Sequence, residues 1–323
     1  MTRDDAGRRC AALFGALVLV AACGSRGGET AGTDVTTTTV VPTTTTTTTP
    51  TFTTIAASAI AVRHLDLVDE DRGRALPTTV WYPAPVSGED IPAATGPFPV
   101  VLFSHGLRGL PEDYESLING WVQDGFVVVA PTYPNTNRGA TSVDAGDLTN
   151  QPADATFVLD AVLSLSTTPG DLLEGALDAD RVAAVGHSEG GITTVGLFDA
   201  CCRDRRLRAA IVLSGNGLGF REPYSGTAAK VLYVHGDTDP LVPIALGRAT
   251  FERNPWPKAF ITLTGAGHLD PYLEPIAAQF ALVRRATSDF LAWALLDDQS
   301  ALDDLRAAVA EPASAATIDD QLG

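Results

Sequence analysis

The chain has 323 residues, 45% of them hydrophobic, and is long enough to bury the core of one large domain or two small ones. It carries 22 lysines and arginines against 39 aspartates and glutamates, which gives a formal net charge of −17. This sign of charge argues against nucleic acid as a partner, because phosphate backbones are bound by basic surfaces.

The chain begins with an arginine-containing stretch, followed by the apolar run "AALFGALVLVAA" at 11–22. The run has the length of a signal-peptide core and is too short to cross a bilayer. It ends in "VAAC", which resembles the lipobox of bacterial lipoproteins. By that resemblance residues 1–22 are a lipoprotein signal peptide, and Cys23 carries lipid that anchors an extracytoplasmic protein to the cell membrane. The alternative is a plain secretory signal cut at a nearby Ala-x-Ala-like site, which predicts a secreted protein.

Residues 23–54 are predicted to be a disordered linker. Threonine makes up most of 30–54, and large apolar side chains are almost absent. Such a segment buries too little surface to offset the loss of chain entropy. Threonine tracts that contain proline are also acceptors of O-linked sugars.

Residues 55–297 alternate apolar strands with amphipathic helices and are predicted to form the folded domain. Strands are predicted within 59–68, 75–83, 98–106, 125–134, 181–188, 208–215, 230–237 and 259–268, and helices at 112–124, 153–165, 189–200, 243–253 and 274–296. This alternation predicts a doubly wound, mostly parallel sheet with helices on both faces. Residues 298–323 are predicted to be a C-terminal tail that packs at the edge of the domain or frays.

The turn "GHSEG" at 186–190 lies between a predicted buried strand and a predicted helix. In a nucleophile elbow the serine adopts a strained backbone conformation, and glycines two residues to either side let the strand and helix approach. The helix that follows directs its N-terminus at the serine, where it favours an anionic intermediate. Ser188 is therefore the candidate nucleophile.

A serine nucleophile needs a base that is held in one tautomer by an acid. "LTGAGHLD" places His268 after the last predicted strand of the domain, and "VLYVHGDTDPLVP" places Asp239 after the preceding one. The chain order Ser188, Asp239, His268 is that of α/β-hydrolases. Asp237 competes as the acid, but it is interpreted as a turn or capping residue because Asp239 directly precedes "PLVP".

The loop "FSHGLRG" follows the strand at 98–104 and is predicted to complete an oxyanion hole. Its Leu107 N–H and the N–H of Glu189, next to the nucleophile, are the candidate donors. The remaining histidines of the domain are interpreted as structural groups at strand ends or in an early strand: His64, His105, His187 and His235.

Two further clusters bear on cofactors and redox state. Cys201 and Cys202 are adjacent, so a bridge between them would be a strained ring, and both this bridge and two free thiols stay open. No cysteine–histidine spacing of a zinc site is present. The loop 141–150 is interpreted as solvated, although Asp144 and Asp147 could together bind a cation. No metal or cofactor is expected.

The segments "LPTTVWYPA", "FPVVLFSHGLRG", "GHSEGG" and "HGDTDPLVP" together resemble α/β-hydrolases of the platelet-activating-factor acetylhydrolase and predicted dienelactone hydrolase group. The resemblance covers about residues 57–300 and implies hydrolysis of esters, often with short acyl chains. It also supports Leu107 and Glu189 as oxyanion donors. The chain departs from dienelactone hydrolases proper, which have a cysteine where this chain has Ser188. Glu189 also replaces an apolar or aromatic residue, and its carboxylate is expected to disfavour anionic substrates.

The segment 216–227 is short where many lipases carry a cap, so no large cap domain and an open site are predicted. The loops 133–150 and 216–227 are expected to border this site, and the candidate substrate-binding walls are Tyr133, Phe220, Tyr224 and Tyr272.

The sequence thus predicts a cell-surface serine hydrolase that cleaves small or polymeric carboxylic esters, with short-to-medium acyl chains favoured. Two alternatives remain. One is a catalytically silent binding lipoprotein with the same fold, since fold alone does not give function. The other is a surface amidase or peptidase, for which the sequence holds no specificity signature.

Overall fold

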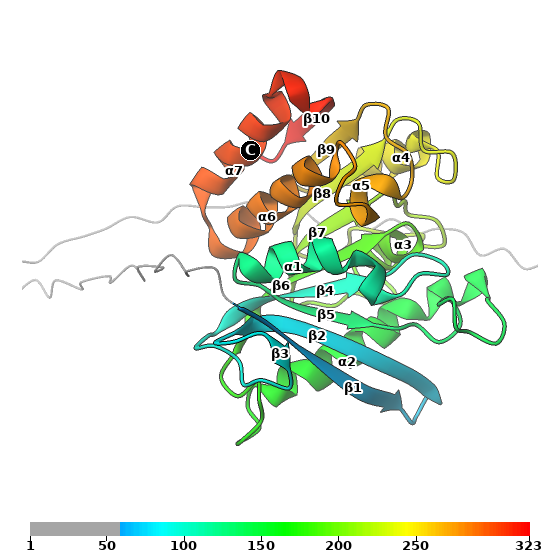
Figure 1. Ribbon diagram of the computed structural model, residues 1–323. Helices are drawn as coiled ribbons and strands as arrows, with labels where there is room; N and C mark the ends of the chain where they lie inside the picture. The colour runs from blue at the N-terminus through cyan, green and yellow to red at the C-terminus, as the bar shows by residue number, and fades with distance from the viewer. Residues whose placement is uncertain (1–58) are drawn as a thin grey trace, which may run out of the picture. The chain divides into compact units, whose positions relative to one another are not determined.

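The computed structural model describes residues 59–323 (Figure 1). The predicted signal peptide, the linker and Cys23 lie outside the described residues. Within residues 59–323, no helix is both long and apolar enough to cross a membrane.

The described residues form one 10-stranded sheet in the order β10-β9-β8-β7-β6-β4-β5-β2-β1-β3. The strands are β1 Ala59–Asp69, β2 Arg74–Ala84, β3 Gly88–Glu89, β4 Phe98–Ser104, β5 Val127–Pro131, β6 Leu177–His187, β7 Leu207–Leu213, β8 Lys230–Gly236, β9 Lys258–Leu263 and β10 Ala316–Gln321. Neighbouring strands are parallel from β9 through β8, β7, β6 and β4 to β5. At the two ends of this parallel part, β10 pairs antiparallel with β9 and β2 pairs antiparallel with β5. The mostly parallel sheet predicted from the alternating pattern is confirmed.

Helices cover both faces of the sheet (Figure 1). They are α1 Glu115–Gln123, α2 Gln151–Leu165, α3 Glu189–Gly196, α4 Ile244–Arg253, α5 Asp270–Leu273, α6 Phe280–Leu296 and α7 Gln299–Ala310, with the short 3₁₀ turns η1 Pro111–Tyr114, η2 Ala145–Thr149 and η3 Pro312–Ser314. Along β4, Val101 and Phe103 belong to the core under α1, α6 and α7, while Val100 and Leu102 belong to the core under α2 and α4. Alternate residues of a strand face opposite sides, so a run of apolar residues such as 98–103 serves both cores.

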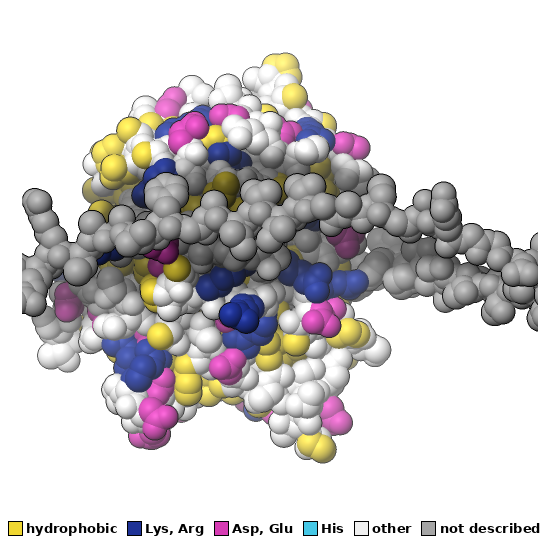
Figure 2. Space-filling model, turned by 180° about the vertical axis from the view of Figure 1, so that it is seen from behind, with side chains coloured by type: hydrophobic (Ala, Val, Ile, Leu, Met, Phe, Trp, Pro, Cys, Tyr) yellow, Lys and Arg dark blue, Asp and Glu magenta, His cyan; other side chains and the backbone are white. Residues whose placement is uncertain are grey.

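Figure 2 shows groups of lysine and arginine side chains on the rear face of the described residues, with acidic side chains among them. Such local clusters matter because a basic patch on an acidic protein attracts anions that the rest of the surface repels.

The C-terminal residues 298–323 pack at the edge of the sheet, which is the first of the two outcomes expected for them. Asp298 caps α7 by accepting hydrogen bonds from the N–H groups of Ser300 and Ala301, at 3.0 and 3.4 Å. The helix buries Leu302, Leu305 and Val309, and β10 then pairs antiparallel with β9. The leucines and the valine of the segment are all buried, which gives it a defined place: Leu302, Leu305, Val309 and Leu322.

We expect Leu305→Ala to lower the free energy of unfolding by about 2–4 kcal/mol, because the fully buried side chain leaves a cavity. Urea denaturation followed by circular dichroism measures this. Asp303→Ala, on the exposed side of the same helix, is the control and should change stability by less than about 0.5 kcal/mol. An equally small effect for Leu305→Ala would mean that the segment frays.

Candidate active site

Ser188 lies at a sharp turn between β6 and α3. Its backbone has φ 57° and ψ −118°, a conformation that non-glycine residues rarely adopt. A Cβ on Gly186 would lie 2.1 Å from the carbonyl oxygen of Gly190, and one on Gly190 would lie 2.0 Å from the carbonyl oxygen of Ser104. Only glycines permit these approaches. The turn therefore has the geometry of the predicted nucleophile elbow.

The structure brings Ser188, His268 and Asp239 into one hydrogen-bond chain. His268 Nε2 is 2.9 Å from Ser188 Oγ, and His268 Nδ1 is 2.6 Å from Asp239 Oδ2. If Nδ1–H donates to the carboxylate, Nε2 is left to accept the serine proton. The arrangement therefore presents a hydroxyl, a base and an acid in the order that nucleophilic catalysis requires.

The Asp239 carboxylate is held by more than the histidine. Its Oδ1 accepts hydrogen bonds from the N–H groups of Leu241 and Val242, both at 2.9 Å. Burial opposes ionisation, but the hydrogen bonds from His268 and from these backbone groups outweigh it and keep the pKa of Asp239 below its usual range. Asp237 instead accepts the N–H of Gly265 at 2.7 Å, which is the turn role expected for it.

Three histidines at strand ends have structural partners. His105 Nδ1 lies 2.8 Å from the carbonyl oxygen of Gly106, and its Nε2 accepts the N–H of Tyr133 at 3.1 Å. His235 Nε2 is 2.8 Å from the carbonyl oxygen of Val242 and 3.4 Å from Asp239 Oδ2, so it supports the acid loop. Burial lowers the pKa of both rings, to about 4 for His105.

The third, His187, links three loops of the site. The Gly106 N–H donates to the Tyr114 hydroxyl at 3.2 Å, and that hydroxyl lies 2.8 Å from His187 Nδ1. His187 Nε2 lies 2.8 Å from the carbonyl oxygen of His268. Burial lowers the pKa of His187 to about 3, so the ring is neutral, with Nε2–H donating and Nδ1 accepting from Tyr114. This relay ties the candidate oxyanion loop to the loop that carries the base, an arrangement that the sequence did not reveal.

The candidate oxyanion donors have suitable surroundings. A Cβ on Gly106 would lie 3.2 Å from Ser188 Cβ, so the loop before Leu107 packs against the nucleophile. Among the described residues, neither the Leu107 N–H nor the Glu189 N–H has a hydrogen-bond acceptor. Two unpaired N–H groups beside a serine nucleophile can donate hydrogen bonds to a tetrahedral oxyanion and so stabilise its negative charge.

The Glu189 side chain does not lie where the sequence suggested. It is 6% exposed, it does not line the cleft around Ser188, and neither of its oxygens has a hydrogen-bond partner in residues 59–323. Burial, followed by the charges of Asp147 and Asp144, raises its pKa to about 8. The carboxyl is therefore mostly neutral at pH 7, and the expected repulsion of anionic substrates by this group is not supported.

A cleft of about 660 Å³ opens over Ser188 and His268. Its walls come from the candidate oxyanion loop, the turn η1, the loop that holds Arg138, the acid loop and the segment after His268. Besides the groups already described, it is lined by Arg108, Gly109, Asp113, Arg138, Leu241, Leu269, Leu273 and Glu274. Leucines and charged side chains of both signs thus surround the nucleophile.

The four predicted substrate-binding aromatics are corrected, because none of them lines this cleft and all are buried. The Tyr133 hydroxyl bonds to Ser104 Oγ at 2.8 Å, and that of Tyr272 to Ser214 Oγ at 2.9 Å. Both residues therefore satisfy their polar groups inside the domain.

Phe220 and Tyr224 lie on the loop 216–227, which does not reach the cleft. The Phe220 ring packs against Gly196 of α3, and the Tyr224 hydroxyl bonds to that of Tyr233. Of the two loops expected to border the site, only 133–150 contributes, through Arg138. The sequence analysis did not predict that the segment after His268 forms a wall of the cleft. Its lining residues there include Leu269, just before the short helix α5, and Leu273, at the end of that helix.

The loop around Asp144 and Asp147 has internal partners. Asp144 caps η2 through the N–H of Gly146, and Asp147 pairs with Arg74 at 2.7 Å. In residues 59–323, no group of three or more histidine, cysteine or acidic side chains is placed to hold a metal ion.

Glu189→Gln tests the buried carboxyl. The pKa of Glu189 is about 8 in the folded protein and has the ordinary value of 4.5 in the unfolded chain. As pH rises from 4.5 to 8 the unfolded chain loses this proton while the folded protein keeps it, so the unfolding free energy of the wild type falls over this range. The difference in unfolding free energy, variant minus wild type, should therefore become more positive from pH 5 to pH 8 in urea denaturation. Glu252→Gln, at an exposed position, is the control. A Glu189→Gln difference that does not change with pH would contradict the raised pKa.

Comparisons with known proteins bear on the fold and on part of the chain. A family model described as Chlorophyllase matches residues 80–212, which include the oxyanion loop and Ser188 but end before Asp239. No curated protein sequence matches the chain. A solved ferulic acid esterase from Streptomyces cinnamoneus is similar in fold, with a TM-score of 0.65 and 20% identity over 83% of this chain and 98% of that one. Together they support an esterase-type hydrolase, while the narrower resemblance to acetylhydrolases stays a prediction. The chain has the fold of the α/β-hydrolases.

Proposed function

We propose that this protein is a serine carboxylic-ester hydrolase that acts outside the cytoplasm and favours short-to-medium acyl chains. The observation that carries the proposal is the continuous chain of hydrogen bonds from Asp239 through His268 to Ser188. The unpaired N–H groups of Leu107 and Glu189 add the second requirement of acyl transfer, a place for the oxyanion.

The reaction follows from these positions. Ser188 Oγ attacks the ester carbonyl carbon and passes its proton to His268 Nε2, while the carbonyl oxygen receives hydrogen bonds from Leu107 and Glu189. Asp239 stabilises the imidazolium. Collapse of the intermediate breaks the bond to the alcohol oxygen, which takes the proton from His268, and leaves an acyl-serine. A water molecule, deprotonated by His268, then releases the acid and restores Ser188.

The cleft supports the preference for modest acyl chains. Its volume of about 660 Å³ suits a small ligand, and its apolar walls are leucines. Arg108 and Arg138 also line the cleft, Arg108 as the neighbour of the candidate oxyanion donor Leu107 and Arg138 in an ion pair with Asp113. The cleft is open to solvent, so a bulky or polymeric ester is compatible with the same chemistry.

The N-terminal sequence supports the location. The apolar run 11–22 and the lipobox-like "VAAC" favour export and lipidation at Cys23, and the threonine-rich segment would then hold the enzyme at a distance from the membrane. A secreted enzyme is the alternative. Radiolabelled palmitate incorporated into the full chain but not into Cys23→Ala would separate the two.

We expect Ser188→Ala to lower kcat/KM for p-nitrophenyl esters by several orders of magnitude, because the acyl-enzyme cannot form. The assay uses a series from acetate to palmitate, with methyl ferulate and a matched anilide added. Ser104→Ala, at a buried strand-end serine outside the triad, is the control and should keep most of the activity.

The acyl-chain profile tests the finer proposal, which expects a maximum at short or medium chains. A faster reaction with the anilide than with the ester would favour an amidase. Equal background rates for wild type and Ser188→Ala on every compound would overturn the hydrolase proposal and favour the silent binding protein.

Tyr114→Phe tests the relay between the catalytic loops. Removing the hydroxyl leaves the Gly106 N–H and His187 Nδ1 without their buried partner, so we expect kcat to fall about 10-fold or more with little change in KM. Tyr133→Phe, which removes a buried hydroxyl bonded only to Ser104, is the matched control. Equal effects of the two variants on kcat would show that the relay has no special role in positioning.

A further inference from the structure

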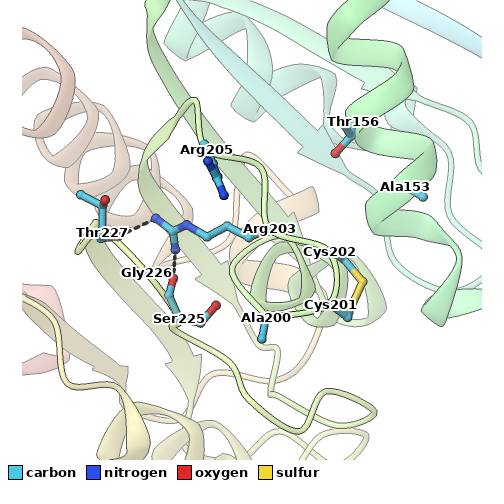
Figure 3. Close-up of a pocket in the computed structure, with 10 residues that line it drawn as sticks. All are labelled: Ala153, Thr156, Ala200, Cys201, Cys202, Arg203, Arg205, Ser225, Gly226 and Thr227. Carbon is cyan, nitrogen blue, oxygen red and sulfur yellow. Dashed lines mark hydrogen bonds between the residues drawn. A yellow bond between two sulfur atoms is a disulfide. The ribbon is translucent and has the colours of Figure 1, made fainter.

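A second cavity, of about 810 Å³, lies between α2 and the turn that joins α3 to β7 (Figure 3). It shares no lining residue with the catalytic cleft. One wall is formed by Cys201 and Cys202, which the structure shows as a disulfide between neighbours, so the alternative of two free thiols is wrong for this structure. The opposite wall carries Arg203 and Arg205.

The disulfide gives this cavity a firm apolar surface. A bond between adjacent residues closes a small ring, which restricts the backbone of the turn. Together with the methyl groups of Ala153 and Ala200, the two sulfur atoms present a weakly hydrated and polarisable patch. Such a patch is suited to pack against the C–H face of a ring.

The charge of the cavity is opposite to that of the protein. Among the described residues that line it, none is acidic, although the whole chain carries a net charge of −17. The nearby Asp204 carboxylate is turned to Arg206, with contacts at 2.5 and 2.9 Å, and Arg206 also bonds to Asp160. Asp204 therefore neutralises a neighbour outside the cavity.

Arg203 is held in place before any ligand arrives. Its guanidinium donates to the carbonyl oxygens of Ser225 and Thr227, both at 2.5 Å (Figure 3). It also lies 5.0 Å from the centre of the Trp256 ring. Burial and then the charge of Arg205 lower its pKa, so the two cations disfavour each other. An anion between them would relieve this repulsion, at little entropic cost for the fixed Arg203.

Arg205 is the second cation of the cavity. It is exposed, and in residues 59–323 it makes no hydrogen bond or ion pair. The hydroxyls of Ser225 and Thr227 line the same cavity and are likewise without a hydrogen bond to the described residues. The cavity therefore combines cations, free hydroxyls and an apolar plate.

We propose that this cavity binds an acidic saccharide, with a carboxylate or phosphate at Arg205 and Arg203, ring hydroxyls at Ser225 and Thr227, and the ring face on the Cys201–Cys202 disulfide. The volume is ample for one or two sugar rings. Such a site would attach the enzyme to an anionic glycan at a place separate from the catalytic cleft.

Isothermal titration calorimetry of the disulfide-bonded protein tests the proposal with glucuronate, glucose 6-phosphate, glucose and inorganic phosphate. At least one acidic sugar should bind 10-fold or more tightly than both glucose and phosphate. The two acidic sugars distinguish a carboxylate from a phosphate ligand. Because the readout is binding, the result does not depend on whether the protein hydrolyses esters.

Arg205→Gln should weaken binding of that sugar about 10-fold or more, since a charge-assisted contact is lost. Arg208→Gln, on β7 outside the cavity, is the matched control and should bind as the wild type does. The double variant Cys201→Ser/Cys202→Ser should also bind the sugar more weakly, while its affinity for phosphate should stay unchanged. Absence of binding by every probe, or equal affinities for wild type and Arg205→Gln, would overturn the proposal. Phosphate that binds as tightly as the sugars would overturn its saccharide part.

Discussion

The site depends on one close backbone contact, between the start of α3 and the end of β4. Gly190 lies so near the carbonyl oxygen of Ser104 that no side chain fits between them. This contact sets the distance from the nucleophile elbow to the oxyanion loop, and Ser188 takes up the strained conformation that results. The strain is tolerated because a parallel sheet, buried on both faces, fixes the strands on either side. The N–H groups that face the cleft owe their position to the same contact.

Buried polar groups that connect the loops also fix the positions of these loops relative to one another. Tyr114 and His187 join the oxyanion loop to the loop of the base, and His235 supports the loop of the acid. Their low dielectric surroundings keep the imidazoles neutral, so each ring has one donor and one acceptor and fixes a direction. The candidate catalytic groups are thus held by partners that lie outside the triad.

The sequence predicted the sheet, the order of the triad and the elbow, because each follows from local signals: apolar runs, glycine spacing and the ends of strands. It did not predict the cleft walls. Tyr133 and Tyr272 also stand at strand ends or beside the base, but their hydroxyls find partners within the core, a non-local outcome that no local pattern encodes. The leucines that do line the cleft become neighbours only when separate loops converge. For 298–323 the sequence left packing at the edge and fraying both open, because the helical signal there is short and the packing depends on α6 and β9.

The antiparallel pairing of β10 with β9 bears on how the sheet is protected. On its other side β9 is parallel to β8, and without β10 the backbone N–H and C=O groups of β9 would be unpaired along the side that β10 covers. An unpaired edge next to a parallel sheet can pair with other chains. β10 instead forms the edge of the sheet as a short strand with the charged side chains of Asp319 and Asp320, a composition that disfavours the addition of a further strand.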